Sequence, residues 1–202
     1  LPIPREIPAK LTVPANQPAG LVHWQAANAN GITAMATFFV SDHREMVESR
    51  FRNEAIDVGS LPVGISGRFS RLTETDVYQL TANKTGPVYL DAWARRLGSN
   101  MNIALQVRGP GGATLVDRVD TLGKDLQVSF PAKQGETYTI TLHEADFRGT
   151  AQFVYRLACS QETPQAAPGS DLKELPAGTP HQQTPLKLTA GKPYRIRALS
   201  QA

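Results

Sequence analysis

The chain has 202 residues, of which 41% are hydrophobic and 19% are charged, and its formal net charge at pH 7 is +3. These fractions are typical of globular domains and exclude a wholly disordered chain. The basic residues are scattered rather than gathered beside aromatic residues, which argues against a nucleic-acid groove, and no apolar run reaches the ~20 residues that span a bilayer. We therefore expect neither a nucleic-acid partner nor insertion into a membrane.

Residues 1–40 predict three short strands that end a small β module. Apolar residues recur in KLTV (10–13), LVHWQAA (21–27) and TAMATFFV (33–40), and turn residues separate these segments. The pair Asn30-Gly31 is a strong signal for a two-residue hairpin turn. Three strands bury too little apolar surface to stand alone, so we expect the earlier strands of this module upstream, in a larger parent protein.

The polar segment 41–57 is predicted to connect this module to the next one. Its sequence permits a short helix over 41–55, with Ser41 as the N-cap. A connector with one or two turns fits the same residues equally well, so both alternatives stay open at this point.

Residues 58–158 carry the clearest pattern, a series of short alternating strands separated by turns with Gly and Pro. Every second residue is apolar in the segments 87–95, 101–108, 125–130, 137–143 and 152–158, which is the period of a half-buried antiparallel strand. In 87–95, the predicted inner face consists of Val88, Leu90, Ala92 and Ala94. The spacing of the turns predicts an all-β fold, an antiparallel β-sandwich of the jelly-roll type.

The last part of the chain has a different composition. Residues 159–185 are rich in Pro, Gln and Ser, as linkers are. Residues 186–202 alternate again and are predicted to begin a further β unit. The single Cys159 cannot form an internal disulfide.

The residue types of catalytic sites are present but not in catalytic arrangements. No two of the four histidines have the spacing of metal ligands. Ser41, Asp42 and His43 are consecutive, so their side chains cannot converge as a triad does. No nucleophile elbow, phosphate loop or dinucleotide motif occurs. We therefore predict that the chain is not an enzyme.

Aromatic residues on one strand are a first candidate for binding. Tyr89 and Trp93 lie on the predicted outer face of 87–95, with Asp91 between them and Arg95 beyond. Aromatic rings with polar neighbours stack on sugar rings or anchor a protein partner. If another segment covers this face, the same rings are packing residues.

Acidic residues at strand ends are a second candidate. Glu74 and Asp76 are two residues apart at the start of a predicted strand, and Asp117, Asp120 and Asp125 surround a later loop. Carboxylates at strand ends can gather calcium, which needs about six to eight oxygen ligands. Such charges are also common in solvated turns that hold no ion.

The order of the segments resembles the bacterial pre-peptidase C-terminal domain, a jelly-roll-like β-sandwich found beside secreted proteases and in large extracellular proteins. The matching segments are GISGRFS (64–70), ETDVYQLTA (74–82), GPVYLDAWARRLGS (86–99), IALQVRGPGGATL (103–115) and PAKQGETYTITLHEADFRGTAQFVYRL (131–157). The segment 10–40 is similar to the tail of an immunoglobulin-like module. The resemblance covers about half of the chain and implies an extracellular, periplasmic or cell-surface location.

Some members of this family bind calcium through an acidic leader that ends in asparagine and through an Asp-x-Asp pair. Here Asn53 matches the leader asparagine, while Phe51 and Arg52 stand where an acid and a proline would be. Glu74 replaces the first aspartate of the pair and Asp76 matches the second. The resemblance therefore implies a calcium site at Asn53, Glu74 and Asp76 that is weakened or lost, and no other cofactor.

Together these observations predict a non-catalytic binding or accessory module of a larger exported bacterial protein. The expected ligand is a carbohydrate or a protein at the cell surface, bound by the sheet face that carries Tyr89, Trp93 and Arg95. The other domains of the parent chain are expected partners as well. A purely structural spacer is the alternative, and the accessory part of a secreted hydrolase is a third possibility.

Overall fold

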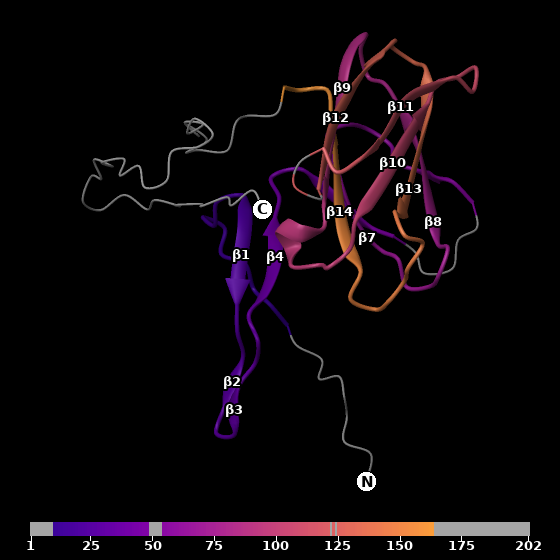
Figure 1. Ribbon diagram of the computed structural model, residues 1–202. Helices are drawn as coiled ribbons and strands as arrows, with labels where there is room; N and C mark the ends of the chain where they lie inside the picture. Colours follow the sequence, from indigo (N-terminus) through magenta and orange to yellow (C-terminus); the bar gives the residue numbers. More distant parts are fainter. Residues whose placement is uncertain (1–9, 49–53, 122, 124, 164–202) are drawn as a thin grey trace, which may run out of the picture. The chain divides into compact units, whose positions relative to one another are not determined.

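The computed structural model describes residues 10–48, 54–121, 123 and 125–163, and most of them form a β-sandwich of two five-stranded sheets (Figure 1). One sheet has the strand order β11-β10-β13-β8-β6, and the other has the order β12-β9-β14-β7-β5. The predicted all-β sandwich is therefore confirmed. Among the described residues, the helical element is one short 3-10 turn, η1 (Arg95–Leu97), and no helix is long and apolar enough to cross a membrane.

Most strands of the sandwich are antiparallel, as the alternating pattern predicts. The first sheet contains β6 (Ile56–Asp57), β8 (Thr75–Thr81), β10 (Ile103–Arg108), β11 (Thr114–Val119) and β13 (Thr137–Glu144). The second contains β5 (Arg44–Val47), β7 (Val63–Arg68), β9 (Gly86–Trp93), β12 (Leu126–Ala132) and β14 (Val154–Ser160). At one edge of each sheet the pairing is parallel, where β5 lies beside β7 and β6 beside β8.

The hydrophobic core lies between the inner faces of the two sheets. The inner residues predicted for β9, which include Val88 and Leu90, are fully buried, and so are Ile103 and Val107 of β10. Successive side chains of a strand point to opposite faces, so an alternating sequence places every second side chain in this core. Burial of apolar surface is the main favourable contribution to folding, and the predicted inner faces are confirmed.

The short helix that was one alternative for 41–55 is wrong, because Arg44–Val47 form strand β5. Met46 packs against the core while Glu45 points outward over Gly64 of β7. A Cβ atom at Gly64 would overlap the Glu45 carboxylate. The missing side chain at Gly64 thus leaves room for the Glu45 carboxylate over β7. The long-range pairing of β5 with β7 overrides a local helical preference that is weak.

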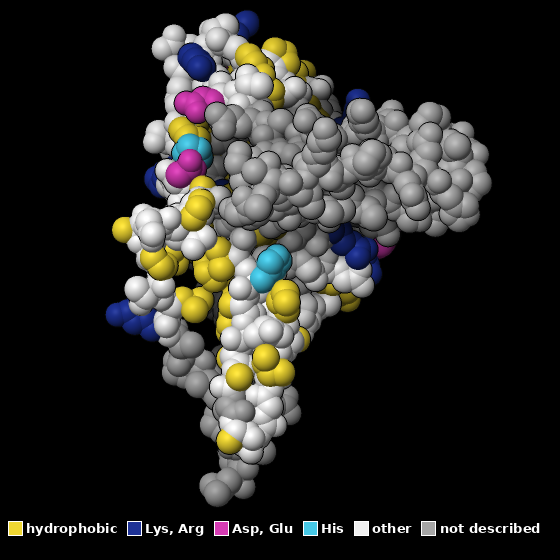
Figure 2. Space-filling view, turned by 90° about the vertical axis from the view of Figure 1, so that its left-hand side faces the viewer, with side chains coloured by type: hydrophobic (Ala, Val, Ile, Leu, Met, Phe, Trp, Pro, Cys, Tyr) yellow, Lys and Arg dark blue, Asp and Glu magenta, His cyan; other side chains and the backbone are white. Residues whose placement is uncertain are grey.

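Residues 20–40 form a hairpin unit ahead of the sandwich strands in the chain. Strand β1 (Gly20–Trp24) pairs with β4 (Ala36–Val40), and β2 (Ala27–Asn28) pairs with β3 (Gly31–Ile32) across the expected turn at Asn30-Gly31. The strand predicted at 10–13 is wrong, since those residues are exposed and unpaired with any strand. Figure 2 shows hydrophobic and uncharged side chains over the lower part of the view, where the β2–β3 hairpin lies.

Several expectations fall outside what the structure describes. The linker was expected over 159–185, but Cys159 and Ser160 still belong to β14, and residues 164–185 lie beyond the described residues, as does the further β unit expected over 186–202. The proposed domain boundaries and the immunoglobulin-like origin of the hairpin unit stay predictions.

Candidate functional site

Three carboxylates converge at one end of the sandwich. One carboxylate oxygen each from Glu48, Glu74 and Asp76 lies within 4.8 Å of the other two. Glu74 precedes β8 and Asp76 is its second residue, whereas Glu48 follows β5. The pair at 74 and 76 was expected from the sequence, but Glu48 was missed. Asn53, the third ligand expected from the family resemblance, lies outside the described residues.

Backbone hydrogen bonds hold Glu48 and Glu74 in place. The N–H of Glu48 donates to the carbonyl of Ser66 (2.9 Å), and the N–H of Arg68 donates to Glu48 Oε2 (3.0 Å). The N–H groups of Ser70 and Arg71 donate to Glu74 Oε2. Both carboxylates are therefore positioned by the strand ends themselves, which is a more rigid support than side-chain contacts alone.

Asp76 is the most deeply buried member of the cluster, with 7% of its surface exposed. The hydroxyl of Tyr155 donates to its Oδ2 (2.5 Å), and Tyr155 is in turn 2.6 Å from the hydroxyl of Tyr78. Burial raises the pKa of Asp76 to about 8; the bond from Tyr155 acts in the opposite direction, and the charge of Glu48 adds to the rise. Burial likewise raises the pKa of Glu48. Carboxylates that share a buried site cannot all ionise unless a cation joins them.

The residues of this cluster fit a calcium ion. Calcium prefers carboxylate oxygens, and three carboxylates offer up to about six of the six to eight ligands that it takes, with water able to supply the rest. A cavity of about 400 Å³ lies beside the cluster and is also lined by Glu54. An ion in this place would balance the charge that burial makes unfavourable for Asp76. Asp117, Asp120 and Asp125 are not part of this cluster.

The predicted aromatic platform is only partly open. The ring of Trp93 is contacted edge-on by Phe39 of β4, with ring centroids 5.1 Å apart and planes at 85°. The guanidinium of Arg96 lies 4.1 Å from the centre of the same ring. Trp93 is half-buried, and its Nε1–H has no acceptor among the described residues. Trp93 thus packs against Phe39 and Arg96, and its role in binding stays a prediction.

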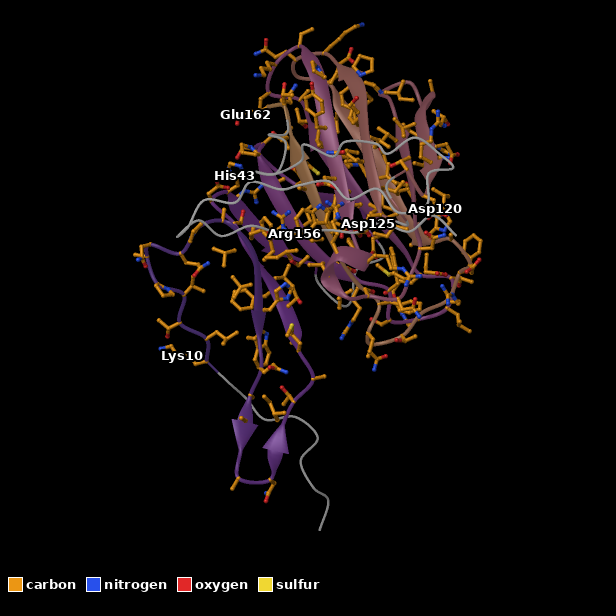
Figure 3. The ribbon with its side chains drawn as sticks, turned by 60° about the vertical axis from the view of Figure 1, so that its left-hand side comes forward. Lys10, His43, Asp120, Asp125, Arg156 and Glu162 are labelled. Atoms are coloured by element: carbon orange, nitrogen blue, oxygen red, sulfur yellow. The ribbon has the colours of Figure 1, made fainter. Side chains whose placement is uncertain are left out.

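The two arginines beside Trp93 are held by carboxylates. Arg96 bonds to Asp91 (2.5 Å) and to Asp125 (2.6 Å), and the buried Asp125 also accepts the N–H of Ala94. Arg156 bonds to Glu45 (2.5 Å). In Figure 3 the labelled Arg156 and Asp125 lie near η1, where strand β9 ends. The Arg96–Asp91 pair is local in sequence, whereas the pairs Arg96–Asp125 and Arg156–Glu45 join remote segments and leave no signal in the sequence spacing.

The other two residues of the predicted site lie in different surroundings. Tyr89 is half-buried on the outer face of β9, opposite Ser129 of β12 and Ser160 of β14. Arg95 is exposed, but it belongs to η1 and not to the strand, so its expected place in a row with Tyr89 and Trp93 is wrong. The Asp125 carboxylate that binds the N–H groups of Ala94 and Arg95 turns the chain away from the sheet at this point.

Comparison with known proteins gives structural likenesses only. No family model and no curated protein matches the sequence. Among solved structures, the chain is similar to the pre-peptidase C-terminal domain of a collagenase from Bacillus anthracis, with 17% identity and a TM-score of 0.44, over 55% of this chain and 100% of that one. It is also similar to a periplasmic inhibitor of g-type lysozyme from Salmonella Typhimurium, with 14% identity and a TM-score of 0.34, over 58% and 97%. Both likenesses are low and concern the fold alone.

Proposed function

We propose that this chain is a non-catalytic accessory module of a larger exported bacterial protein and that calcium bound by Glu48, Glu74 and Asp76 stabilises it. The observation that carries the proposal is the convergence of three carboxylates on one site, with Asp76 buried among them. The ion would supply positive charge there. The protein side chains hold it and do no chemistry on a substrate.

The ion would also join the two layers of the sandwich. Glu48 follows a strand of the second sheet, whereas Glu74 and Asp76 flank the start of a strand in the first sheet. Because only the folded chain brings these carboxylates together, calcium binds the folded state and shifts the unfolding equilibrium toward it.

Thermal unfolding in calcium and in EDTA tests the ion site. Extracellular calcium modules have Kd values of about 10⁻⁴–10⁻³ M. At about ten times Kd the ion adds about 1.4 kcal/mol of stability, which corresponds to about 5 °C in Tm for a domain of this size. Glu74→Gln should abolish the increase in Tm that calcium causes. Glu162→Gln, at an exposed position outside the cluster, should retain that increase. Equal Tm values in calcium and EDTA would refute the site.

We further propose that the outer face of the β9 sheet recognises carbohydrate. Support comes from the position of Tyr89 between Ser129 and Ser160 on the neighbouring strands. An aromatic ring flanked by hydroxyl groups is suited to a sugar, because the ring packs on the C–H face and the hydroxyls bond to the sugar oxygens. Trp93 and Arg95, the other residues expected from the sequence, would lie at the border of such a site.

A glycan array with the intact chain tests this second part. Tyr89→Ala should remove the binding signal, while Leu115→Ala, an exposed apolar residue of the other sheet, should retain it. Binding that survives Tyr89→Ala would place recognition elsewhere. Binding to a protein partner in place of any glycan would favour the protein alternative, and binding to neither would favour a structural spacer.

A further inference from the structure

One aromatic side chain of the hairpin unit covers part of the outer sheet face at the end of β9. Phe39 of β4 meets Trp93 edge-on, and the guanidinium of Arg156 lies 4.0 Å from the centre of the Phe39 ring. Trp93 and Arg156 are directly paired neighbours in β9 and β14. The Phe39 ring, which lies outside the two sheets of the sandwich, therefore contacts both Trp93 and Arg156.

Two buried hydrogen-bond donors beneath this cover have no acceptor. They are the Nε1–H of Trp93 and the Nε–H of Arg156, neither of which has a partner among the described residues. Arg156 as a residue is only 7% exposed, and its Nη2 is already bonded to Glu45. Buried donors are nearly always paired in folded proteins. An unpaired donor loses its bond to water without replacement, so these two groups oppose the covered arrangement.

An open cleft also borders the cover. It has a volume of about 440 Å³ and lies where β4 meets the sandwich, lined by Thr37 and Phe39 on one side and by Leu97, Val154 and Arg156 on the other. The cleft limits the area over which β4 contacts the sheet. Segments with few buried contacts open locally at a lower free energy than the core does. The unpaired donors and the cleft thus both favour local opening of β4.

We propose that β4 is a removable cover on Trp93 and Arg156, and that it must lift before this part of the sheet binds a saccharide. The proposal extends the proposed carbohydrate recognition by the same sheet and rests on it for the identity of the ligand. Once β4 lifts, the indole offers a ring face, and both unpaired N–H groups can donate to sugar oxygens. Apparent affinity is then reduced by the fraction of molecules in which the cover is open.

Quenching of Trp93 fluorescence by acrylamide measures the cover without any ligand. The chain has two tryptophans, so a Trp24→Phe background leaves Trp93 as the only reporter. Phe39→Ala should raise the quenching constant about threefold or more, since the open form becomes the major one. Met35→Ala is the matched control, because this apolar residue just before β4 is exposed and does not line the cleft. Equal quenching in the Phe39→Ala and parent proteins would overturn the cover.

A second measurement keeps the test decisive if Phe39→Ala impairs folding. Hydrogen exchange of the Trp93 indole N–H is followed in the Trp24→Phe protein, with Phe39 intact. Exchange faster than global unfolding supports local lifting of β4, whereas exchange only through global unfolding contradicts it.

The glycan array separates this proposal from the one on which it rests. If the cover is open in about 1% of molecules, Phe39→Ala should raise the apparent affinity for a bound glycan by up to about 100-fold. If quenching is faster in Phe39→Ala and neither this variant nor the parent protein binds a glycan, the cover is supported and carbohydrate recognition is refuted. Glycan binding that Phe39→Ala leaves unchanged would refute the cover alone.

Discussion

Replacing Asp76 by asparagine should stabilise the sandwich in EDTA and destabilise it in calcium. Asparagine keeps an oxygen that accepts the hydrogen bond from Tyr155, but it carries no charge. Without an ion, the variant avoids the repulsion that Asp76 experiences from Glu48 and Glu74. With calcium present, it lacks one of the three carboxylates that would hold the ion.

The size of the effect follows from the raised pKa of Asp76, about 8 in the folded chain. Between about pH 4 and that value, the folded chain holds a proton on Asp76 that the unfolded chain has released, so stability falls as pH rises. Each unit of pKa difference is worth about 1.4 kcal/mol, which sets an upper limit of about 6 kcal/mol. Relaxation and water entry reduce this figure, and we expect Asp76→Asn to add about 2–3 kcal/mol near pH 8 in EDTA.

Urea unfolding at several pH values from about 5 to about 8, in EDTA and in calcium, checks this reasoning. The parent protein should lose stability with rising pH in EDTA, and the Asp76→Asn variant should lose much less. Asp117→Asn, at an exposed position on β11, serves as the control. If Asp76→Asn destabilises the protein equally in both buffers, Asp76 acts only as a hydrogen-bond acceptor and the reasoning fails.

Three further changes test the packing. Trp93→Ala should reduce the free energy of unfolding, measured with urea, by about 1–3 kcal/mol, because the ring contacts are lost. An unchanged free energy of unfolding would show that the contacts of the Trp93 ring do not stabilise the fold. Gly149→Ala should destabilise by about 1–3 kcal/mol, because its Cβ would overlap the backbone of Arg71, and Gly111→Ala, with open space around it, should be neutral; similar losses would contradict close contact between Gly149 and Arg71. Burial raises the pKa of Cys159 to about 12, so DTNB at about pH 8 should label it only after unfolding; rapid labelling of the native protein would argue otherwise.

The alternating segments made the sandwich predictable. In β9 and β10 the period of two assigns each side chain to the core or to the outer face, and this assignment needs no knowledge of neighbouring strands. The hairpin turn at Asn30-Gly31 was predictable for a similar reason, since the two residues alone favour the required backbone angles. By contrast, β5 has four residues and no clear period, and its parallel partner lies in a distant part of the chain.

The candidate sites were predictable only in part. Glu74 and Asp76 are close in sequence, so their proximity is local, whereas Glu48 reaches them through the pairing of β5 with β7. The outward direction of Trp93 was also predictable, but the segment that covers it was not. Phe39 meets Trp93 through packing between separate strands, which leaves no signal in the spacing of either residue.

The sequence by itself determined which faces of the strands are apolar, because side-chain alternation is a property of a single extended segment. Only the tertiary structure decided that Glu48 meets Glu74 and Asp76 and that Phe39 lies on Trp93 and Arg156. Both arrangements depend on which strands become neighbours. That choice is made by the packing of the whole chain, since many pairings satisfy the same local pattern.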